Sequence, residues 1–289
     1  MNTIRQILSE GRKRLESACV EDASLSADLL IAFVLNTERA RLPLLWEDNA
    51  PPEAVERFFA LVQRRIAHEP LQYLLGTWSF LDFSVKVGPE ALIPRPETEE
   101  LLLAVVAEIE RARFRPDFTF VDICTGSGVL GIALARKFNQ ATGWISDISA
   151  EALRIAAQNL AINLPGQRSR VAALQGDLLS TFAENSLDLV IANPPYICSA
   201  DISGLMPEVR DFEPILALDG GPDGLELIRT IFVQAVKCLR PGGILAFEHG
   251  HGQRQSILAL AKGFGAFSLI DAADDLCGCE RYVIIKAEK

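Results

Sequence analysis

Apolar residues recur at helical spacing along the N-terminal part of the chain and predict three or four short amphipathic helices. The apolar faces of three of them consist of Ile4, Ile7, Leu8 and Leu15, then of Leu25, Leu29, Ala32 and Phe33, and then of Val55, Phe58, Phe59, Val62 and Ile66. Pro51-Pro52 marks the start of the third helix, because proline is tolerated in the first helical turn. We therefore expect residues 1–75 to form a small helical bundle domain.

The pattern changes beyond this domain. Residues 78–87 alternate loosely around a turn at Leu81-Asp82, which predicts a β-hairpin linker over residues 76–91. Over residues 92–289, short apolar runs alternate with helical patterns, so we expect an α/β domain with a mostly parallel sheet and helices on both faces. The predicted strands are Thr119–Ile123, Thr142–Ser146, Val171–Gln175, Leu187–Ala192, Gly243–Phe247, Phe267–Ile270 and Tyr282–Lys286. The last two lie close together in the sequence and are expected to pair antiparallel at one edge.

Composition and charge limit the kinds of molecule that the protein is expected to bind. The 289 residues are 49% hydrophobic and 23% charged, which is ordinary for a globular enzyme. The net charge of -10 repels duplex nucleic acid unless a basic patch is set apart. The densest basic run, Arg12-Lys13-Arg14, is flanked by Glu10 and Glu16 and is typical of a solvated helix face. We expect no direct nucleic-acid binding.

Other sequence features suggest a protein of the cytoplasm. The start of the chain has no apolar stretch typical of a signal peptide, and no run reaches the ~18 apolar residues of a membrane span. The six cysteines, which fit free thiols, are Cys19, Cys124, Cys198, Cys238, Cys277 and Cys279. Neither the C-x-C pair at 277–279 nor His249 and His251 has obvious further ligands nearby, so no metal site is expected.

A glycine-containing turn follows the first strand of the α/β domain. Its residues are Cys124-Thr125-Gly126-Ser127-Gly128, and a helical pattern begins directly after them. Glycines at a strand-to-helix turn let the backbone approach a ligand closely. The G-x-G pattern alone is weak, because a tight turn that binds nothing shows it as well.

Acidic residues at the ends of the next two strands strengthen the case for a nucleotide-like ligand. Asp147 lies 21 residues after Gly126, where a carboxylate accepts hydrogen bonds from both ribose hydroxyls. These two features fit a dinucleotide and S-adenosylmethionine equally. Asp177 and Leu178 follow the third strand, and they are suited to the exocyclic amine and the ring of adenine. A turn or a helix cap is the alternative role for Asp177.

The fourth strand ends in the tetrapeptide Asn193-Pro194-Pro195-Tyr196, which should face the glycine turn across the sheet. An amide nitrogen is a poor nucleophile because its lone pair is delocalised. The side-chain oxygen of Asn193 and the carbonyl of Pro194 are placed to accept its two hydrogens and to aim the nitrogen at a methyl carbon. Proline fixes φ, and Tyr196 is suited to lie on a planar group. An Asn-Pro turn without function is the alternative.

These motifs together resemble the HemK-like protein-glutamine methyltransferases, and the resemblance covers nearly the whole chain. It rests on the stretches Glu69-Pro70-Leu71-Gln72-Tyr73-Leu74-Leu75-Gly76, Leu92-Ile93-Pro94-Arg95-Pro96-Glu97-Thr98-Glu99, Asp122–Gly128, Asn193–Tyr196 and Phe212-Glu213-Pro214, and on Glu248 with Gln253. The Pro-Arg-Pro-Glu-Thr-Glu stretch is the most discriminating. Asn-Pro-Pro-Tyr is shared with the adenine-N6 methyltransferases.

The resemblance implies a helical domain that helps to dock a peptide chain release factor, followed by a Rossmann-like, seven-stranded, S-adenosylmethionine-dependent methyltransferase domain. It implies that residues 124–128, Asp147 and Leu178 contact the cofactor. It implies that residues 193–196 hold the glutamine of a Gly-Gly-Gln loop, and Asn193 is expected to border the cofactor as well. The segment with Arg95 is expected to lie over the cofactor, although a helix cap is an alternative. Cys124 stands where the family often has glycine, and Leu178 where some members have an aromatic residue.

Three other functions are alternatives to this one. An adenine-N6 methyltransferase would use Asn193 on an extruded base, and the acidic balance argues against it. A glutamine methyltransferase of a ribosomal protein is a relative that the Pro-Arg-Pro-Glu-Thr-Glu stretch disfavours. A nucleotide-binding module without catalysis would have no use for two acceptors directed at an NH2 group.

Overall fold

A computed structural model describes residues 3–167, 169–274 and 278–288. The α-helices are α1 (Ile4–Ser17), α2 (Ala23–Val34), α3 (Leu42–Leu45), α4 (Pro52–Ile66), α5 (Leu71–Leu75), α6 (Pro96–Ala112), α7 (Val129–Lys137), α8 (Ala150–Asn163), α9 (Pro207–Phe212), α10 (Glu226–Cys238) and α11 (Arg254–Phe264). The strands are β1 (Thr77–Phe80), β2 (Phe83–Lys86), β3 (Thr119–Ile123), β4 (Thr142–Asp147), β5 (Val171–Gln175), β6 (Leu187–Ala192), β7 (Leu239–Glu248), β8 (Phe267–Asp274) and β9 (Glu280–Ala287). Short 3-10 helices lie at Arg39–Arg41, Ile202–Gly204 and Ile215–Ala217.

The chain forms two compact units. The helical unit comprises Met1–Thr77 and Met206–Phe212, and the α/β unit comprises Trp78–Leu205 and Glu213–Lys289. Among the described residues, none of the helices has both the length and the apolar character that crossing a membrane requires.

The helical unit is built on α1, α2 and α4, which contact one another pairwise. A capping box at Thr3 starts α1, whose buried residues include all four of its predicted apolar positions. The predicted face of α2 is only partly confirmed, since Ala32 is buried but Phe33 is 43% exposed, while Leu30 and Ile31, outside that face, are fully buried. This helix is apolar on several sides, so its periodicity did not select a face.

Helix α9, although it comes late in the sequence, belongs to the helical unit. The buried side chain of Arg65 connects it to that unit. Arg65 of α4 pairs with Glu208 of α9 at 2.6 Å, and its side chain is only 5% exposed. The same guanidinium donates to Ser26 Oγ at 3.4 Å and to the carbonyl of Glu69 at 3.1 Å. A buried charge requires such partners, and the helical pattern of α4 did not predict them.

The predicted hairpin is confirmed as β1 and β2, with Leu81 at a positive φ in the turn. Asn159 of α8 attaches it to the rest of the α/β unit. Asn159 Oδ1 accepts from the N–H of Lys86 at 2.7 Å, and Nδ2 donates to the carbonyls of Lys86 at 3.0 Å and Ser127 at 2.9 Å. One buried side chain therefore joins β2 to the glycine turn.

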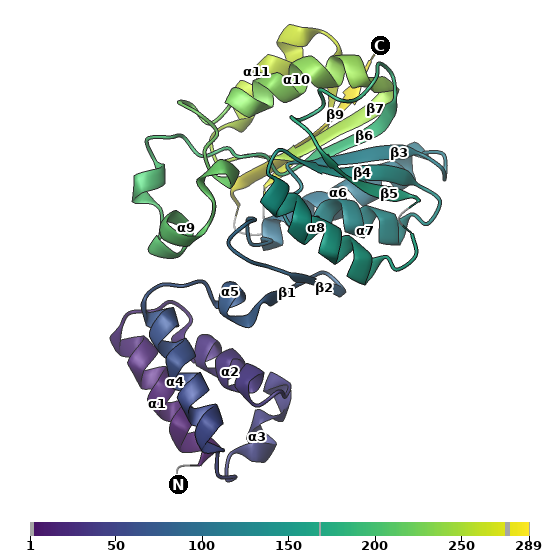
Figure 1. Ribbon diagram of the computed structural model, residues 1–289. Helices are drawn as coiled ribbons and strands as arrows, with labels where there is room; N and C mark the ends of the chain where they lie inside the picture. Colours follow the sequence, from purple (N-terminus) through teal and green to yellow (C-terminus); the bar gives the residue numbers. More distant parts are fainter. Residues whose placement is uncertain (1–2, 168, 275–277, 289) are drawn as a thin grey trace. The chain divides into compact units, whose positions relative to one another are not determined.

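The predicted fold class is confirmed by a seven-stranded sheet in the order β5-β4-β3-β6-β7-β9-β8. The strands β3 to β7 pair in parallel, while β9 runs antiparallel to both of its neighbours. Helices α6, α7 and α8 cover one face, and α10 and α11 cover the other (Figure 1). The strand β7 begins at Leu239 and is longer than predicted, because its Pro241-Gly242-Gly243 stretch reads as a turn in the sequence.

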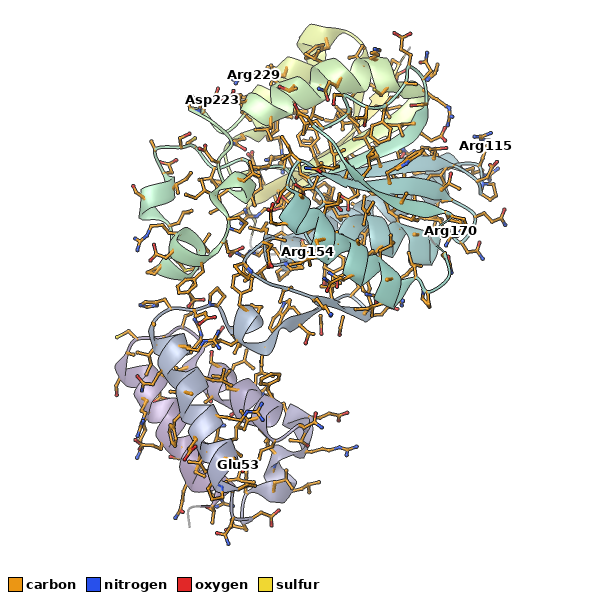
Figure 2. The ribbon with its side chains drawn as sticks, viewed as in Figure 1. Glu53, Arg115, Arg154, Arg170, Asp223 and Arg229 are labelled. Atoms are coloured by element: carbon orange, nitrogen blue, oxygen red, sulfur yellow. The ribbon has the colours of Figure 1, made fainter. Side chains whose placement is uncertain are left out.

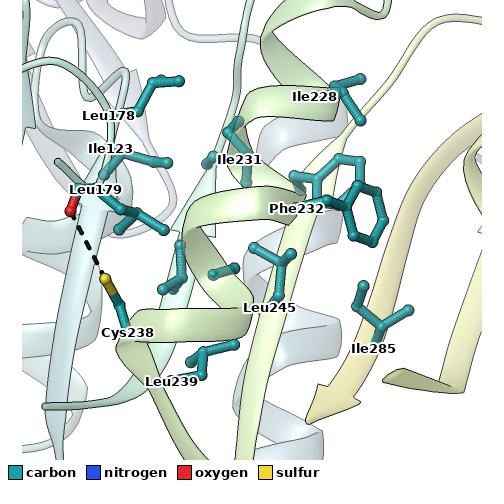
Figure 3. Packing of buried hydrophobic residues seen from close by; sticks show 14 of the residues in the cluster. Ile123, Leu178, Leu179, Ile228, Ile231, Phe232, Cys238, Leu239, Leu245 and Ile285 are labelled. Atoms are coloured by element: carbon teal, nitrogen blue, oxygen red, sulfur yellow. Dashed lines mark hydrogen bonds between the residues drawn. The ribbon is translucent and has the colours of Figure 1, made fainter. Parts of the chain in front are cut away.

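One core of the α/β unit lies between the sheet and α10. Ile228, Ile231 and Phe232 of α10 face apolar side chains of the strands, among them Leu245 and Ile285 (Figure 3). Burying such a side chain fully contributes ~1.5–3 kcal/mol. This packing fixes the sheet whose carboxyl ends carry the site.

Strand register sets the order of residues along that carboxyl edge. Ser146 pairs with Ile123, Ile123 pairs with Ala192, and Ala192 pairs with Phe247. The next residue of each strand therefore lies in one row, which contains Asp147, Cys124, Asn193 and Glu248. Figure 2 shows Arg115 and Arg170 at the opposite end of the sheet, where β3 and β5 begin.

Candidate active site

A cavity of about 310 Å³ opens at the carboxyl edge of the sheet. Its walls include residues 124–127 of the glycine turn, Asp147 after β4, Asp177 and Leu178 after β5, and Asn193 and Pro195 after β6. Segments predicted separately from the sequence thus meet around one cavity. Gly128, Pro194, Tyr196 and Arg95 are not among the described residues that line it.

The glycine turn follows β3 with a backbone that favours glycine. Gly126 and Gly128 have φ values of 54° and 88°. Cys124 adopts a φ of 53° in the same left-handed region, which costs a residue with a Cβ some strain. Gly131 is required for a different reason, because an added Cβ would lie 2.4 Å from Ile145 Cγ2.

Asp147 holds the turn and faces the cavity. Its Oδ2 accepts from the N–H of Gly126 at 2.9 Å, and its Oδ1 accepts from the N–H of Ser149 at 2.9 Å. Burial raises the pKa of Asp147, while these backbone donors lower it. Each carboxylate oxygen keeps a further lone pair, so the group still has acceptors for a pair of hydroxyls.

Asp122 supports the turn from beneath. Its Oδ2 accepts from the Thr125 hydroxyl at 2.5 Å and from the N–H of Gly131 at 2.9 Å. Burial raises the pKa of Asp122 to about 7, against the lowering effect of these two bonds. Its Oδ1 is buried and has no hydrogen-bond partner among the described residues.

The two residues after β5 differ in exposure. Asp177 is exposed, whereas Leu178 is buried with a φ of 50°. Leu178 therefore offers the cavity an apolar wall, and Asp177 offers a carboxylate at its rim.

The Asn-Pro-Pro-Tyr tetrapeptide, residues 193–196, follows β6. Nδ2 of Asn193 donates to Thr98 Oγ1 at 3.1 Å, while its Oδ1 is buried without a partner among the described residues. The Tyr196 hydroxyl donates to Glu248 Oε1 at 2.8 Å, and burial raises the pKa of this hydroxyl. Burial also raises the pKa of Glu248, although the hydroxyls of Thr98 and Tyr196 lower it.

The residues of the segment Pro94–Glu99 make different contacts. Pro94 and Thr98 line the cavity, whereas Arg95 pairs with the buried Glu213. Glu213 also accepts from the N–H of Ile93 at 3.1 Å, so it fixes the backbone that borders the cavity. Glu99 accepts from the N–H of Leu81 at 2.8 Å.

Sequence patterns did not identify the contacts of Thr98 and Glu213. Asn193 lies 95 residues from Thr98, and Arg95 lies 118 residues from Glu213. Local periodicity carries no information on such distant pairs. The family resemblance included both residues in its motifs without giving them a role.

The charge of the cavity restricts its ligand. Its lining includes the carboxylates of Glu90, Asp147 and Asp177 and no Lys or Arg among the described residues. Such a wall favours a cationic ligand and repels phosphate groups. Among all the described residues, no group of three His, Cys, Asp or Glu side chains is arranged to hold a metal ion. Cys277 lies outside the described part of the chain.

Comparison with known proteins finds similarity in both units of the chain. The family model described as "PrmC N-terminal domain" matches residues 6–76, and the one described as "Methyltransferase small domain" matches residues 99–205. A release factor glutamine methyltransferase of Moorella thermoacetica is 40% identical over 96% of this chain and 96% of its own. That of Gloeobacter violaceus is 40% identical over 90% of this chain and 89% of its own.

Solved structures share the fold. A methyltransferase from Pyrococcus furiosus has a TM-score of 0.52 and 16% identity, over 73% of this chain and 92% of that one. The tRNA m1G37 methyltransferase of M. jannaschii has a TM-score of 0.52 and 11% identity, over 74% of this chain and 56% of that one. Identities this low indicate the fold alone. The 40% identity over nearly full length indicates more: the chain belongs to the family of release factor glutamine methyltransferases.

Proposed function

We propose that this protein transfers a methyl group from S-adenosylmethionine to the side-chain amide nitrogen of the glutamine in the Gly-Gly-Gln loop of a peptide chain release factor. The observation that carries the proposal is the buried Oδ1 of Asn193, an acceptor without a partner among the described residues at the wall of the cavity. A buried acceptor of this kind costs ~1–3 kcal/mol unless a donor reaches it. The NH2 group of a glutamine is such a donor.

The residues around the cavity fit the cofactor. The carboxylate-bearing wall matches its cationic sulfonium and amino groups. Asp147 would accept from the ribose hydroxyls, Leu178 would pack on the adenine, and residues 124–127 would approach with backbone atoms. S-adenosylmethionine supplies, when bound, a methyl group activated by its positively charged sulfur.

The tetrapeptide would prepare the nucleophile. Asn193 Oδ1 and the Pro194 carbonyl would each accept one hydrogen of the glutamine NH2 group. Holding both hydrogens aims the nitrogen lone pair and stabilises the charge that develops on the nitrogen. No Lys or Arg of the described residues lines the cavity, which counts against a nucleic-acid substrate.

We also propose that the helical unit docks the release factor. A short glutamine loop offers the cavity little contact area, so further area must come from elsewhere on this protein. The helical unit has its own core, centred on residues such as Leu15, Ile31 and Phe58, and so presents a preformed surface.

The test uses the purified protein, methyl-labelled S-adenosylmethionine and purified release factor, with peptide mapping of the label. We expect the label on the glutamine of the Gly-Gly-Gln loop. Asn193→Ala should lower the single-turnover rate ~10²–10³-fold, by analogy with other preorganised partners, and leave cofactor affinity nearly intact. Asn139→Ala, at an exposed turn, is the control. Label on nucleic acid, or near-normal turnover by Asn193→Ala, would contradict the proposal.

A further inference from the structure

One buried carboxylate holds both ends of the Asn-Pro-Pro-Tyr tetrapeptide. Glu248, at the end of β7, is 2% exposed. Its Oε1 accepts from the Tyr196 hydroxyl at 2.8 Å, and its Oε2 accepts from the Thr98 hydroxyl at 2.7 Å. Thr98, itself 3% exposed, accepts in turn from Asn193 Nδ2 at 3.1 Å. The four side chains form one continuous chain of hydrogen bonds.

Counting protons along this chain fixes the direction of each bond. With Glu248 in its ionised form, both of its oxygens accept, and the hydroxyl of Thr98 has one proton to donate. The proton of Thr98 therefore lies on the bond to Glu248, and Thr98 faces Asn193 with lone pairs only. The amide of Asn193 must direct its NH2 group at Thr98. The flipped amide would set two acceptors against each other and lose a bond.

The orientation of this amide matters for the substrate. With Nδ2 on Thr98, the carbonyl oxygen is the atom left for the substrate, and it has no other partner among the described residues. A flipped Asn193 would present its NH2 group to the NH2 group of the glutamine, two groups that only donate. One hydrogen bond behind the site thus decides which atom the site presents.

We propose that Thr98 and Glu248 are positioning residues that lock the Asn193 amide with its oxygen toward the nucleophile. The inference rests on the proposed function, in which that oxygen accepts a hydrogen of the substrate amide. Glu248 ties Tyr196 to the same carboxylate, so the first and last residues of the tetrapeptide are oriented by one buried group.

The fold brings these groups together from distant parts of the sequence. The register of β6 and β7, in which Ala192 pairs with Phe247, sets Asn193 beside Glu248. Thr98 comes from the first turn of α6, which packs on β7. Gln253 adds a third support to the tetrapeptide, since its Nε2 donates to the carbonyl of Tyr196 at 2.9 Å.

The first experiment compares two substitutions at one position in the full-length protein. Thr98→Val keeps the branched shape and removes the hydroxyl, while Thr98→Ser keeps the hydroxyl. With saturating release factor and cofactor, Thr98→Val should lower the single-turnover rate by about tenfold to a hundredfold, the usual effect of losing a group that orients a reactive one. Thr98→Ser should restore it to within about threefold of wild type, and the Kd for S-adenosylmethionine should change less than about threefold in both.

A matched control tests the effect of a Thr-to-Val change away from the site, and a second variant covers the case in which Thr98→Val does not fold. Thr230→Val makes the same change at an exposed site of α10 and should leave the rate unchanged. Glu248→Gln keeps the size of the side chain but leaves one acceptor oxygen for two hydroxyl donors. It should lower the rate like Thr98→Val, and it serves as the test if circular dichroism shows Thr98→Val unfolded.

A readout that needs no activity separates this inference from the proposed function. The side-chain NH2 signals of Asn193 in a nitrogen-15 spectrum are identified by their loss in Asn193→Asp. They should shift in Thr98→Val and in Glu248→Gln and stay in place in Thr98→Ser. If wild type methylates no release factor while the signals respond this way, the proposed function fails and the positioning inference stands. If wild type methylates but Thr98→Val keeps the wild-type rate, or leaves the signals unmoved, the inference is overturned.

Discussion

At the scale of single residues, Asp147 both holds the glycine turn and faces the cavity. A substitution of this residue affects both roles at once. It accepts one backbone N–H on each oxygen, from Gly126 and Ser149, and it presents the remaining lone pairs to the cavity. Asp147→Ala should therefore weaken S-adenosylmethionine binding by roughly tenfold or more, since a charge-assisted hydrogen bond contributes ~1.5–3 kcal/mol. Titration calorimetry measures this. Asp271→Ala, which removes an exposed carboxylate bonded to a backbone N–H, is the control. Unchanged affinity in a folded Asp147→Ala protein would refute the ribose role.

Asp122 makes the stability of the protein depend on pH. The folded-state pKa of Asp122 is raised to about 7, whereas an aspartate in an unfolded chain has a pKa of ~3.9. Its stabilising contribution is therefore complete below pH ~4 and declines as the pH rises toward 7, because the unfolded chain releases the proton first. Between pH 5 and pH 8, wild type should lose about 2–3 kcal/mol relative to Asp122→Asn, which has no proton to lose.

Urea unfolding of both proteins at several pH values, without cofactor, measures this difference. Subtracting the two curves removes the titration of every other group. Parallel curves over the whole range would show that Asp122 is ionised in the fold.

Residue types and spacing predicted several of the residues that line the cavity. The glycine turn, Asp147, Leu178 and Asn193 meet at one cavity, as the strand ends implied. The partner of Arg95 could not be predicted this way, because Glu213 lies 118 residues later and pairs with it only once both loops are folded. Long-range side-chain pairing leaves no periodic signal in the sequence.

At the scale of elements, Asn159 links helix α8, strand β2 and the glycine turn through three hydrogen bonds from one fully buried side chain. Asn159→Ala would leave the N–H of Lys86 and two carbonyls without these bonds. We expect a loss of ~2–4 kcal/mol in the free energy of unfolding. Chemical denaturation gives the value.

The neighbouring helix position supplies the comparison. Asn163, one turn further along α8, donates to the carbonyl of Ser84 at 3.1 Å in an exposed setting. Asn163→Ala should cost less than ~1 kcal/mol, because water replaces that bond. Equal losses in the two variants would mean that the helix, and not the link to the glycine turn, governs the stability.

Strands were predicted more reliably than the helices of the first unit. Four of the five parallel strands lie within one residue of their predicted bounds, because each is a short run that turns bound on both sides. Helix α2 is apolar on several sides, so its buried face depends on where its neighbours lie. The placement of α9 with the first unit depends on Arg65, which no local pattern of residues 206–212 reveals.

At the scale of the whole molecule, the two units predict where the chain should be divided. A chain that begins at Trp78 keeps β2 and the bonds of Asn159, whereas one that begins at Pro89 loses β2 and the two Asn159 bonds to Lys86. The first should fold and bind S-adenosylmethionine with a Kd within about threefold of the full chain, and the second should be less stable by the ~2–4 kcal/mol expected of Asn159→Ala. Calorimetry and denaturation compare them directly.

The truncated chain from Trp78 to Lys289 also tests the docking role of the helical unit. Docking contacts made equally in the ground state and the transition state affect KM and leave kcat unchanged. Losing ~1.4 kcal/mol or more of such contacts should raise the KM for intact release factor tenfold or more. Residues 206–212 lose Arg65 as a partner in this chain and should become more sensitive to protease. A short peptide containing the Gly-Gly-Gln loop makes no docking contacts, so both chains should methylate it equally. If the shortened chain instead methylates intact release factor with an unchanged KM, the helical unit serves some other purpose.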